Sequence, residues 1–229
     1  MKILGITTSS SICGIAILDN EKIIKEINLN NGLTQSETLL PLINNILKDT
    51  NLNLQDIDLL ATDIGPGSFT GIRIGISTIK AFCDSLNLQS YGVSSLEALT
   101  LNSEKSGLNC SIIDAKHENI YSQIFEIVNK EAIPKSNSSF STIYDFIENL
   151  KPLASNSSIS FVGDGAKAYK DILLESFPNC TICNDTNLYA KNFALIALKK
   201  YNIQKESSIQ PLYIKKSEAE INLEKKNES

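Results

Sequence analysis

The chain has 229 residues, of which 42% are apolar and 21% are charged, and its formal net charge is −5 at pH 7. Such a composition is typical of a globular protein with one large domain or two small ones. No apolar run approaches the roughly 20 residues of a membrane-spanning helix, and the first residues already show a strand pattern. We therefore expect a cytoplasmic protein without a signal peptide or membrane contact. Because affinity for nucleic acids depends largely on neutralising phosphates, this acidic chain is expected to bind RNA poorly by itself.

The cysteines and the single histidine limit the metal chemistry of the chain. Cys180 and Cys183 form a CxxC pair, but no second pair and no histidine cluster is available to complete four zinc ligands. His117 is the only histidine, which excludes metal motifs that need two. We therefore predict no metal site and expect all 5 cysteines to be reduced thiols. A metal or redox role for the CxxC pair is the alternative.

The first part of the chain has the element order β-β-β-α-β-α-β-α, with its first three strands joined by short turns as an antiparallel meander. Ser94 and Glu97 form a capping box for the last helix. The predicted elements are the strands 2–7, 13–19 and 22–29, the helix 36–49, the strand 57–64, the helix 71–86, the strand 89–93 and the helix 94–101.

The second part repeats this order in weaker form. We therefore predict an α/β fold with two copies of one unit, each a mixed sheet flanked by helices. The predicted elements are the strands 109–115, 120–128 and 131–134, the helix 142–150, the strand 159–162, the helix 166–175, a strand around Thr181 and the helix 188–200, with loops at 136–141 and 154–158. The predicted limits are an N-terminal domain over 1–103, a smaller C-terminal domain over 104–216 whose last segment is a candidate to pack back, and a flexible tail over 217–229.

A glycine-rich motif, D-I-G-P-G-S-F-T-G-I-R-I-G, occupies residues 63–75. Glycine supplies backbone freedom and proline fixes one φ angle, so the motif predicts a tight loop ahead of a helix that Ser68 and Thr70 are placed to cap. Its spacing fits neither a Walker A loop nor the dinucleotide fingerprint. An anion or nucleotide site, a partner interface and a purely structural turn all remain open. The loop residues concerned are Gly65, Pro66, Gly67, Ser68, Phe69, Thr70 and Arg73, the last of which either pairs with a carboxylate or phosphate or is merely exposed.

The two long helices of the first part carry wide apolar surfaces. The apolar and small side chains cover an arc of about 220° on helix 71–86 and about 160° on helix 36–49, whereas one sheet covers only about 100°. Gly71 and Gly75, one turn apart, would let another backbone approach closely. We therefore predict that a partner covers part of both helices; burial inside the chain itself is the alternative. The predicted partner-binding residues are Leu39, Leu40, Ile43, Leu47, Gly71, Ile72, Gly75, Ile76, Ile79, Phe82 and Cys83.

Several segments together resemble the TsaB family, also called YeaZ, within the actin and sugar-kinase superfamily. The motif of residues 63–75 is similar to the family signature. Residues 35–42 look like the family's first helix, G-V-S-S-L at 92–96 like the strand after the motif, and P-L-Y-I-K at 211–215 like its closing segment. The resemblance covers most of the chain up to about residue 215. It implies duplicated actin/sugar-kinase-like, or ribonuclease H-like, domains.

The resemblance also implies an accessory role in tRNA modification. In this family the protein forms a heterodimer with the catalytic subunit TsaD through the two N-terminal-domain helices, and TsaE, a small ATPase, joins them. TsaD transfers threonylcarbamoyl to the adenosine beside the anticodon of tRNAs that read codons beginning with A. The chain would then be a non-catalytic scaffold without a catalytic residue or cofactor of its own, with ATP and metal on the partner subunits. It would meet tRNA only through the complex, and a homodimer is an option for the isolated chain.

Two positions depart from the family pattern. Thr7 stands where nucleotide-binding relatives have an acidic residue, and Gln35 stands where many family members have histidine. Threonine cannot carry the charge that would order a metal or water beside a phosphate. Both departures weaken a claim to intrinsic nucleotide chemistry.

Two other functions stay open on the sequence alone. An independent phosphotransferase of the sugar-kinase type would hold nucleotide phosphates with the turns at residues 9–11 and 163–165 and would use Asp63 as its base. A glycoprotease-like peptidase would need His117 as its base, although no serine and acid stand at a fixed spacing from it.

Overall fold

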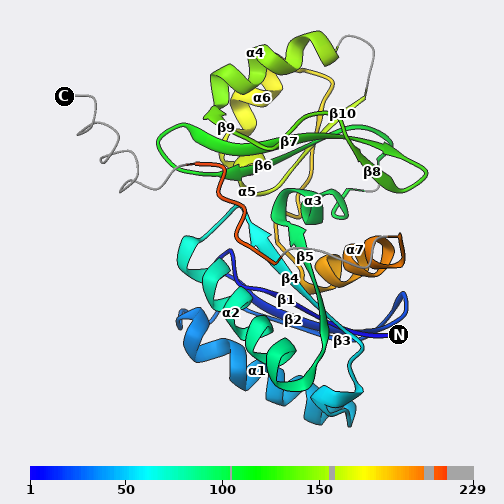
Figure 1. Ribbon diagram of the computed structural model, residues 1–229. Coiled ribbons are helices and arrows are strands. Elements are labelled where there is room, and N and C mark those ends of the chain that lie inside the picture. Colours follow the sequence, from blue (N-terminus) through cyan, green and yellow to red (C-terminus); the bar gives the residue numbers. More distant parts are fainter. Residues whose placement is uncertain (104, 155–157, 204–208, 216–229) are drawn as a thin grey trace, which may run out of the picture.

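Two β-sheets lie one above the other in the computed structural model, with helices between them and on their outer faces (Figure 1). The structure describes residues 1–103, 105–154, 158–203 and 209–215. The predicted flexible tail, residues 217–229, lies outside these ranges, and the predicted domain limits stay predictions. Within the described ranges no helix is both long enough and apolar enough to cross a lipid bilayer. The predicted α/β class with two mixed sheets flanked by helices is confirmed.

The first sheet has the strand order β3-β2-β1-β4-β5. β1 pairs antiparallel with β2, from Lys2 opposite Asp19 to Thr7 opposite Gly14, and it pairs in parallel with β4. The motif therefore starts at the end of a strand next to the centre of the sheet. The strands are β1 (Lys2–Thr7), β2 (Cys13–Asp19), β3 (Lys22–Leu29), β4 (Leu59–Gly65) and β5 (Gln89–Ser94).

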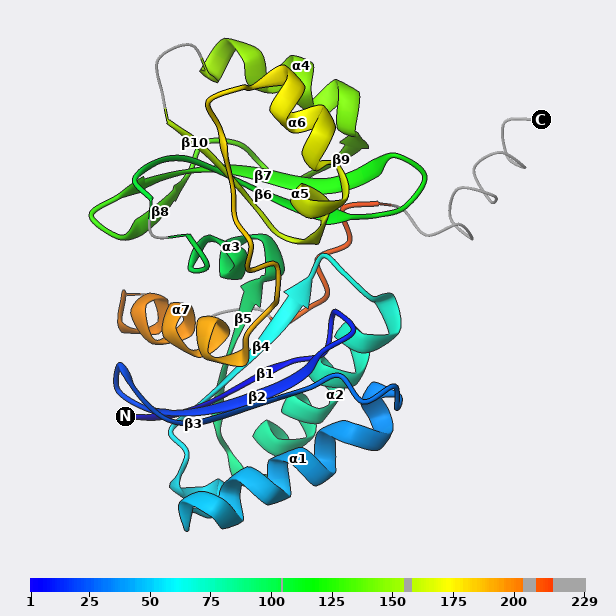
Figure 2. The same cartoon turned by 180° about the vertical axis from the view of Figure 1, so that it is seen from behind.

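Helices cover both faces of the first sheet, as the almost continuously apolar sequences of β1, β2 and β4 require. α1 (Gln35–Thr50) and α2 (Phe69–Leu86) cover one face, and α7 (Ala190–Ile203) covers the other (Figure 2). Successive residues of β1 show this division, because side chains alternate along a strand. Ile3 packs in the same core as Phe193 of α7, whereas Leu4 packs in the core beneath α1 and α2.

The second sheet has the strand order β11-β10-β6-β7-β8, with β9 paired to β7. Its outer core contains Phe146 of α4 and Leu173 of α6, packed on Cys110 of β6. The strands are β6 (Gly107–Asp114), β7 (Asn119–Val128), β8 (Glu131–Pro134), β9 (Ser139–Thr142), β10 (Ile159–Val162) and β11 (Thr181–Ile182), and the helices are α4 (Ile143–Ala154), α5 (Asp164–Ala168) and α6 (Lys170–Ser176).

α7 and the short helix α3 (Ser95–Thr100) form a layer between the two sheets (Figure 1). Leu96 of α3 and Phe193 of α7 share one core with Phe125 of the second sheet. The buried Asn192 side chain of α7 donates a hydrogen bond of 3.0 Å to the Ala98 carbonyl oxygen. α7 thus packs on the first sheet although it follows the second sheet in the sequence.

Three local elements differ from the predicted ones. Residues 136–141, predicted as a loop, include part of β9, where Phe140 lies opposite Tyr121 of β7. This polar segment is a strand because β7 offers it an edge that β8 leaves unpaired, which no local pattern reveals. The single helix predicted over residues 166–175 is divided into α5 and α6 at Tyr169, where φ is −109°. A short 3-10 helix, Leu54–Asp56, precedes β4 and was not predicted.

Residues 209–215 form a closing segment that connects the first sheet to the second (Figure 1). Ile209 packs into the core beneath α1 and α2. The Leu212 amide donates a hydrogen bond of 2.7 Å to the Ile64 carbonyl oxygen in β4. The Lys215 Nζ lies 5.0 Å from the centre of the Phe140 ring in β9. The closing segment therefore ties the motif strand to the second sheet.

Replacing Ile209 by Ala should lower the free energy of unfolding by about 2 to 3 kcal/mol, because it leaves a cavity in the core beneath α1 and α2. Urea denaturation would measure this loss. The neighbouring Gln210→Ala is the matched control, since Gln210 is exposed and its truncation should change stability by less than about 0.5 kcal/mol. Equal effects of the two variants would show that the closing segment does not depend on Ile209.

Candidate functional site

The carboxylate of Asp63 fixes the turn between β1 and β2. Asp63 is fully buried in β4. Its Oδ2 accepts hydrogen bonds from the Thr7 hydroxyl at 2.7 Å, the Thr8 amide at 3.1 Å and the Ser9 amide at 2.9 Å. Burial raises the pKa of the Asp63 carboxyl, while the hydrogen bonds from Ser9, Thr7 and Thr8 oppose that shift. Asp63, the candidate base of the phosphotransferase hypothesis, is thus used to hold a turn.

Two glycines of the motif let this turn pack directly onto α2. A Cβ at Gly71 would overlap the Thr8 carbonyl oxygen, and a Cβ at Gly75 would lie 2.6 Å from the Thr8 Oγ1. The Thr8 hydroxyl donates a hydrogen bond of 2.8 Å to the Gly71 carbonyl oxygen. A backbone does approach these glycines closely, as their spacing predicts, but it belongs to the chain itself.

The loop before α2 has the tight form that the motif predicts. Gly65 has a φ of +99°, which favours glycine. Ser68 is the N-cap of α2, and its Oγ accepts a hydrogen bond of 3.2 Å from the Gly71 amide. Thr70, the other predicted cap, lies exposed inside the first turn of the helix. The Ser68 amide donates to the Ser9 carbonyl oxygen at 2.7 Å, so the loop and the β1–β2 turn hold each other.

The positions that depart from the family pattern both serve the same turn. Thr7 donates its hydroxyl to Asp63. The Gln35 Nε2 at the start of α1 donates a hydrogen bond of 2.8 Å to the Ser10 carbonyl oxygen. The Ser9 and Ser95 hydroxyls lie 3.3 Å apart, which adds a contact from α3. The first turns of α1, α2 and α3 therefore converge on one short segment.

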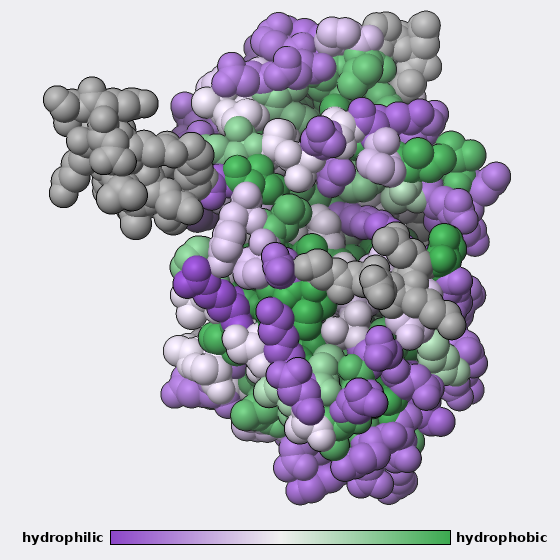
Figure 3. Space-filling model, viewed as in Figure 1, coloured by the Kyte–Doolittle hydropathy of each residue, from purple (hydrophilic) through white to green (hydrophobic). Residues whose placement is uncertain are grey.

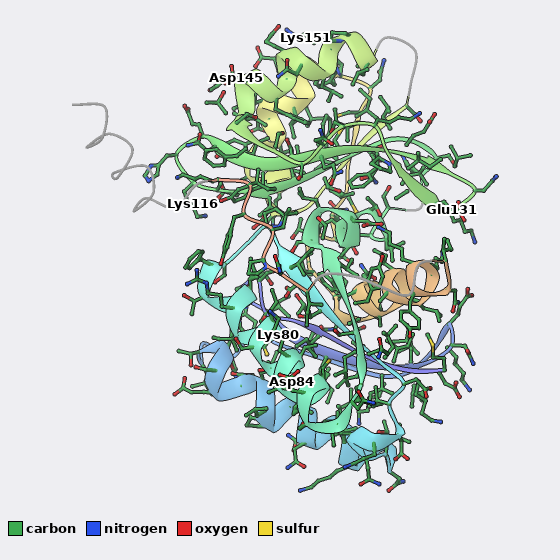
Figure 4. The ribbon with its side chains drawn as sticks, in the orientation of Figure 1. Lys80, Asp84, Lys116, Glu131, Asp145 and Lys151 are labelled. Carbon is green, nitrogen blue, oxygen red and sulfur yellow. The ribbon has the colours of Figure 1, made fainter. Side chains whose placement is uncertain are left out.

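A cleft of about 430 Å³ lies where this turn faces the second sheet. Its polar lining comes from the β1–β2 turn, the motif loop, the end of β6 and the start of α5. Figure 4 shows Lys116 at the turn that follows β6. The polar lining residues are Ser9, Ser10, Ser11, Ser68, Asp114, Lys116, Tyr121, Asp164 and Thr186.

The charges in the cleft do not fit a polyphosphate. The Lys116 Nζ forms an ion pair of 2.7 Å with the Asp114 Oδ2, and the Tyr169 hydroxyl donates a hydrogen bond of 3.2 Å to the Asp114 Oδ1. Burial acts to raise the pKa of Asp114, but the hydrogen bonds and the charge of Lys116 outweigh it and lower that pKa. Burial raises the pKa of Asp164, which accepts a hydrogen bond of 3.0 Å from the Asp114 amide. The two carboxylates would repel nucleotide phosphates unless a metal came with them, and the lysine that could attract a phosphate is already paired with Asp114.

Most of the predicted partner-binding residues are buried within the chain. α1 and α2 pack against each other as well as on the sheet, and the closing segment covers part of the core beneath them. The helical-wheel estimate therefore overstated the uncovered surface of α1 and α2, because the chain itself covers much of it. In this conformation these residues are covered by the chain itself, and their role in partner binding stays a prediction. Those at most 4% exposed are Leu39, Ile43, Ile72, Ile76 and Ile79, and Gly71 and Gly75 are buried as well.

Only part of the predicted set remains accessible among the described residues of α1 and α2. Leu40 is 56% exposed, while Leu47, Phe82 and Cys83 are partly buried. The lower half of Figure 3, where the two helices lie, mixes apolar with polar side chains. Figure 4 shows Lys80 and Asp84 along the exposed side of α2. Leu40, Leu47 and Phe82 remain candidates for contact with a partner, and we call these three the apolar docking residues.

Arg73 forms a stacked cluster with two aromatic side chains. Its guanidinium carbon lies 3.7 Å from the centre of the Phe69 ring, and its Nε donates a hydrogen bond of 2.9 Å to the Tyr213 hydroxyl. The Phe69 and Tyr213 rings lie 5.5 Å apart. No local pattern connects Tyr213 with Arg73, because 140 positions separate them. The one available signal was the resemblance of residues 211–215 to the family's closing segment.

The cysteines and His117 do not gather into a metal-binding group in the part of the chain that the structure describes. No group of three or more His, Cys, Asp or Glu residues is placed there to hold a metal ion. Cys180 and Cys183 are free and partly buried, and the Cys183 thiol donates to the Asn102 carbonyl oxygen at 3.2 Å. His117 lies exposed in the turn between β6 and β7.

Known proteins resemble this chain over most of its length. The family model described as TsaD, tRNA N6-adenosine threonylcarbamoyltransferase, matches residues 33–223. A Bacillus subtilis (strain 168) protein named tRNA threonylcarbamoyladenosine biosynthesis protein TsaB is 30% identical over 177 residues, which cover 76% of this chain and 75% of that protein. The chain belongs to the TsaB family.

Solved structures show the fold expected of a TsaB-family member. A Pseudomonas aeruginosa protein, described as uncharacterized with similarity to peptidase YEAZ, superposes with a TM-score of 0.77 at 19% identity, covering 93% of this chain and 99% of that one. The ROK hexokinase of Thermus thermophilus superposes with a TM-score of 0.51 at 9% identity, covering 90% of this chain and 100% of the other. At these identities the likeness shows the fold alone. The predicted actin and sugar-kinase type is confirmed.

Replacing Asp63 by Asn tests the buried carboxylate through the pH dependence of stability. The unfolded pKa is about 3.9 and the folded pKa is raised, so the folded state binds a proton more readily. The contribution of Asp63 to the free energy of unfolding is therefore fully present below the unfolded pKa and is lost as the pH rises through the folded pKa. Urea titrations from about pH 4 to pH 8 should show the wild type losing stability relative to Asp63→Asn as the pH rises. A flat or opposite trend would contradict the raised pKa of the Asp63 carboxyl.

Replacing Gly71 by Ala should lower the free energy of unfolding by about 2 to 3 kcal/mol, because the added methyl group overlaps the Thr8 carbonyl oxygen. Chemical denaturation would measure the loss. Ser77→Ala is the matched control, since Ser77 is exposed on the same helix and should change stability by less than about 0.5 kcal/mol. If both variants were equally stable, the close packing of the turn on α2 would be wrong.

Proposed function

We propose that this chain is the non-catalytic scaffold subunit of the cytoplasmic complex that makes threonylcarbamoyladenosine in tRNA. It binds the catalytic subunit TsaD through the accessible part of α1 and α2, and TsaE joins the pair. TsaD transfers the threonylcarbamoyl group to the adenosine beside the anticodon of tRNAs that read codons beginning with A. The chain meets tRNA only through this complex.

The observation that carries this proposal is the 30% identity to a protein named for threonylcarbamoyladenosine biosynthesis, extending over three quarters of both chains. The geometry of the cleft favours a supporting role over catalysis. Asp63 is buried and occupied with the β1–β2 turn, and Thr7 provides no carboxylate at the end of β1. Lys116, which lines the cleft, is paired with Asp114.

The accessible apolar surface favours α1 as the main docking element. Leu40 lies on α1 with 56% of its surface exposed, and Leu47 and Phe82 are partly buried. A partner that covers Leu40 would remove its apolar surface from water, which is the usual driving force of association. In the isolated chain, a homodimer would cover the same apolar surface. Gly75 and Ile76 are unsuitable targets for testing this interface, because both are buried.

The variant Leu40→Asp should weaken binding to TsaD by about tenfold or more, because it places a charge in an apolar contact, and it should leave the monomer folded. Isothermal titration calorimetry with purified TsaD would measure the affinity, and thermal unfolding would confirm the fold.

Leu153→Asp is the matched control for this variant. Leu153 is 49% exposed on α4, which lies on the second sheet, so its substitution should change the affinity less than twofold. Loss of binding in both variants, or in neither, would refute α1 as the docking element. Wild-type protein that does not bind TsaD at all would refute the proposed function.

A further inference from the structure

Arg73 is the only arginine in the chain, and every other strongly basic residue is a lysine. The two side chains differ chemically, because guanidinium is planar and offers five N–H donors in a fixed fork, whereas ammonium is a compact point charge. Because the chain uses lysine elsewhere, the arginine at position 73 indicates that the planar guanidinium group is needed there. The guanidinium group can serve contacts within the chain, contacts with a binding partner, or both.

The contacts with other described residues hold the guanidinium group in place but use few of its N–H donors. Phe69 stacks on it at 3.7 Å, and the Tyr213 hydroxyl accepts from Nε at 2.9 Å. Neither contact supplies negative charge. Among the residues that the structure describes, seven ion pairs involve lysine or the amino terminus, and none involves Arg73. The charge of Arg73 is therefore oriented without being neutralised within the described part of the chain.

The cluster is also open to the surroundings. Phe69 is 47% exposed, Tyr213 is 50% exposed, and Arg73 is exposed as well. Arginine and aromatic residues that pack on one another at a surface are the types most enriched at the energetic centres of protein interfaces. A guanidinium that is held flat by stacking loses little conformational entropy when it binds a carboxylate through two parallel hydrogen bonds.

We propose that Phe69, Arg73 and Tyr213 form an anchor that binds an aspartate or glutamate side chain of the partner subunit. This inference rests on the proposed function for the identity of the partner, and it adds a charged anchor to the apolar docking residues. A protein carboxylate fits better than an RNA phosphate, because the chain carries a net charge of −5 and Arg73 is the one basic residue in this cluster.

The anchor makes the closing segment part of the docking surface. The closing segment that carries Tyr213 is held by the hydrogen bond of Leu212 to Ile64 at the end of β4 and by the burial of Ile209 beneath α1 and α2. The partner therefore binds a surface built from two distant parts of the sequence. A chain whose closing segment is not in place presents an incomplete anchor.

The test is a titration of purified TsaD from the same organism with the full-length chain and its variants. Arg73→Gln should weaken binding by about 10- to 100-fold and reduce its dependence on salt. Arg73→Lys should lose nearly as much, because an ammonium group keeps the charge but lacks the planar fork. Lys170→Gln removes one exposed positive charge from α6 and is the control, with an expected change of less than twofold.

Thermal unfolding separates anchoring from a purely structural role. Tyr213→Phe removes the hydroxyl that accepts from Arg73 but keeps the ring, so it should weaken TsaD binding severalfold while leaving the melting temperature nearly unchanged. If the affinity loss in Arg73→Gln and Tyr213→Phe only follows a loss of folded protein, the cluster serves the fold alone and the inference is overturned. Rescue of Arg73→Glu by a single acidic-to-lysine change in TsaD would support the carboxylate directly.

The failures of the two proposals can be told apart. Wild-type binding that Leu40→Asp weakens and Arg73→Gln leaves unchanged would overturn the anchor and keep the scaffold role. Arg73→Gln that leaves TsaD affinity unchanged but weakens tRNA binding by the assembled complex would identify a phosphate as the occupant and overturn the carboxylate. Absence of any binding between the wild-type chain and TsaD would overturn both.

Discussion

The structure of the first half depends on one buried carboxylate, that of Asp63. Burying a carboxyl group is costly unless donors bind its oxygens, and here a hydroxyl and two amides of the β1–β2 turn converge on one oxygen. These hydrogen bonds fix the β1–β2 turn. Three helices contact it with residues of their first turns: α1 with Gln35, α2 with Gly71 and α3 with Ser95. The glycine-rich motif therefore acts first as a packing device. Its glycines at positions 71 and 75 let the backbone of the β1–β2 turn lie against α2, and that backbone belongs to the same chain.

This packing decides how much surface is left for a partner. The apolar arc of α2 is shared between the sheet, α1 and the core that Ile209 completes, so its outer side is largely polar. What stays accessible is a set of partly exposed apolar residues and the stacked Phe69, Arg73 and Tyr213. The chain thus exposes no fully apolar helix face among its described residues, and such a face would promote aggregation.

The predicted elements agree with the structure where the pattern is strongly periodic. The strands of the first sheet, α2 and the Ser68 cap were evident, because alternation, helical spacing and capping are local properties. The sequence was less informative in the second half. β9 is a polar segment that becomes a strand only beside β7, and the division between α5 and α6 at Tyr169 has no glycine or proline to mark it. The candidate site shows the same limit, since Ser68 and Arg73 belong to a visible motif but Tyr213 and Asp114 do not.

The family, the fold class and the motif follow from the sequence alone, because they depend on residue types at short, fixed spacing. Which apolar residues are buried was decided by the tertiary structure. A helical wheel counts the width of an apolar surface, but it cannot tell whether a sheet, a neighbouring helix or a distant segment covers it. Arg73 is an example. Tyr213 orients its guanidinium group through a hydrogen bond between residues 140 positions apart, and no local sequence pattern predicts such a contact.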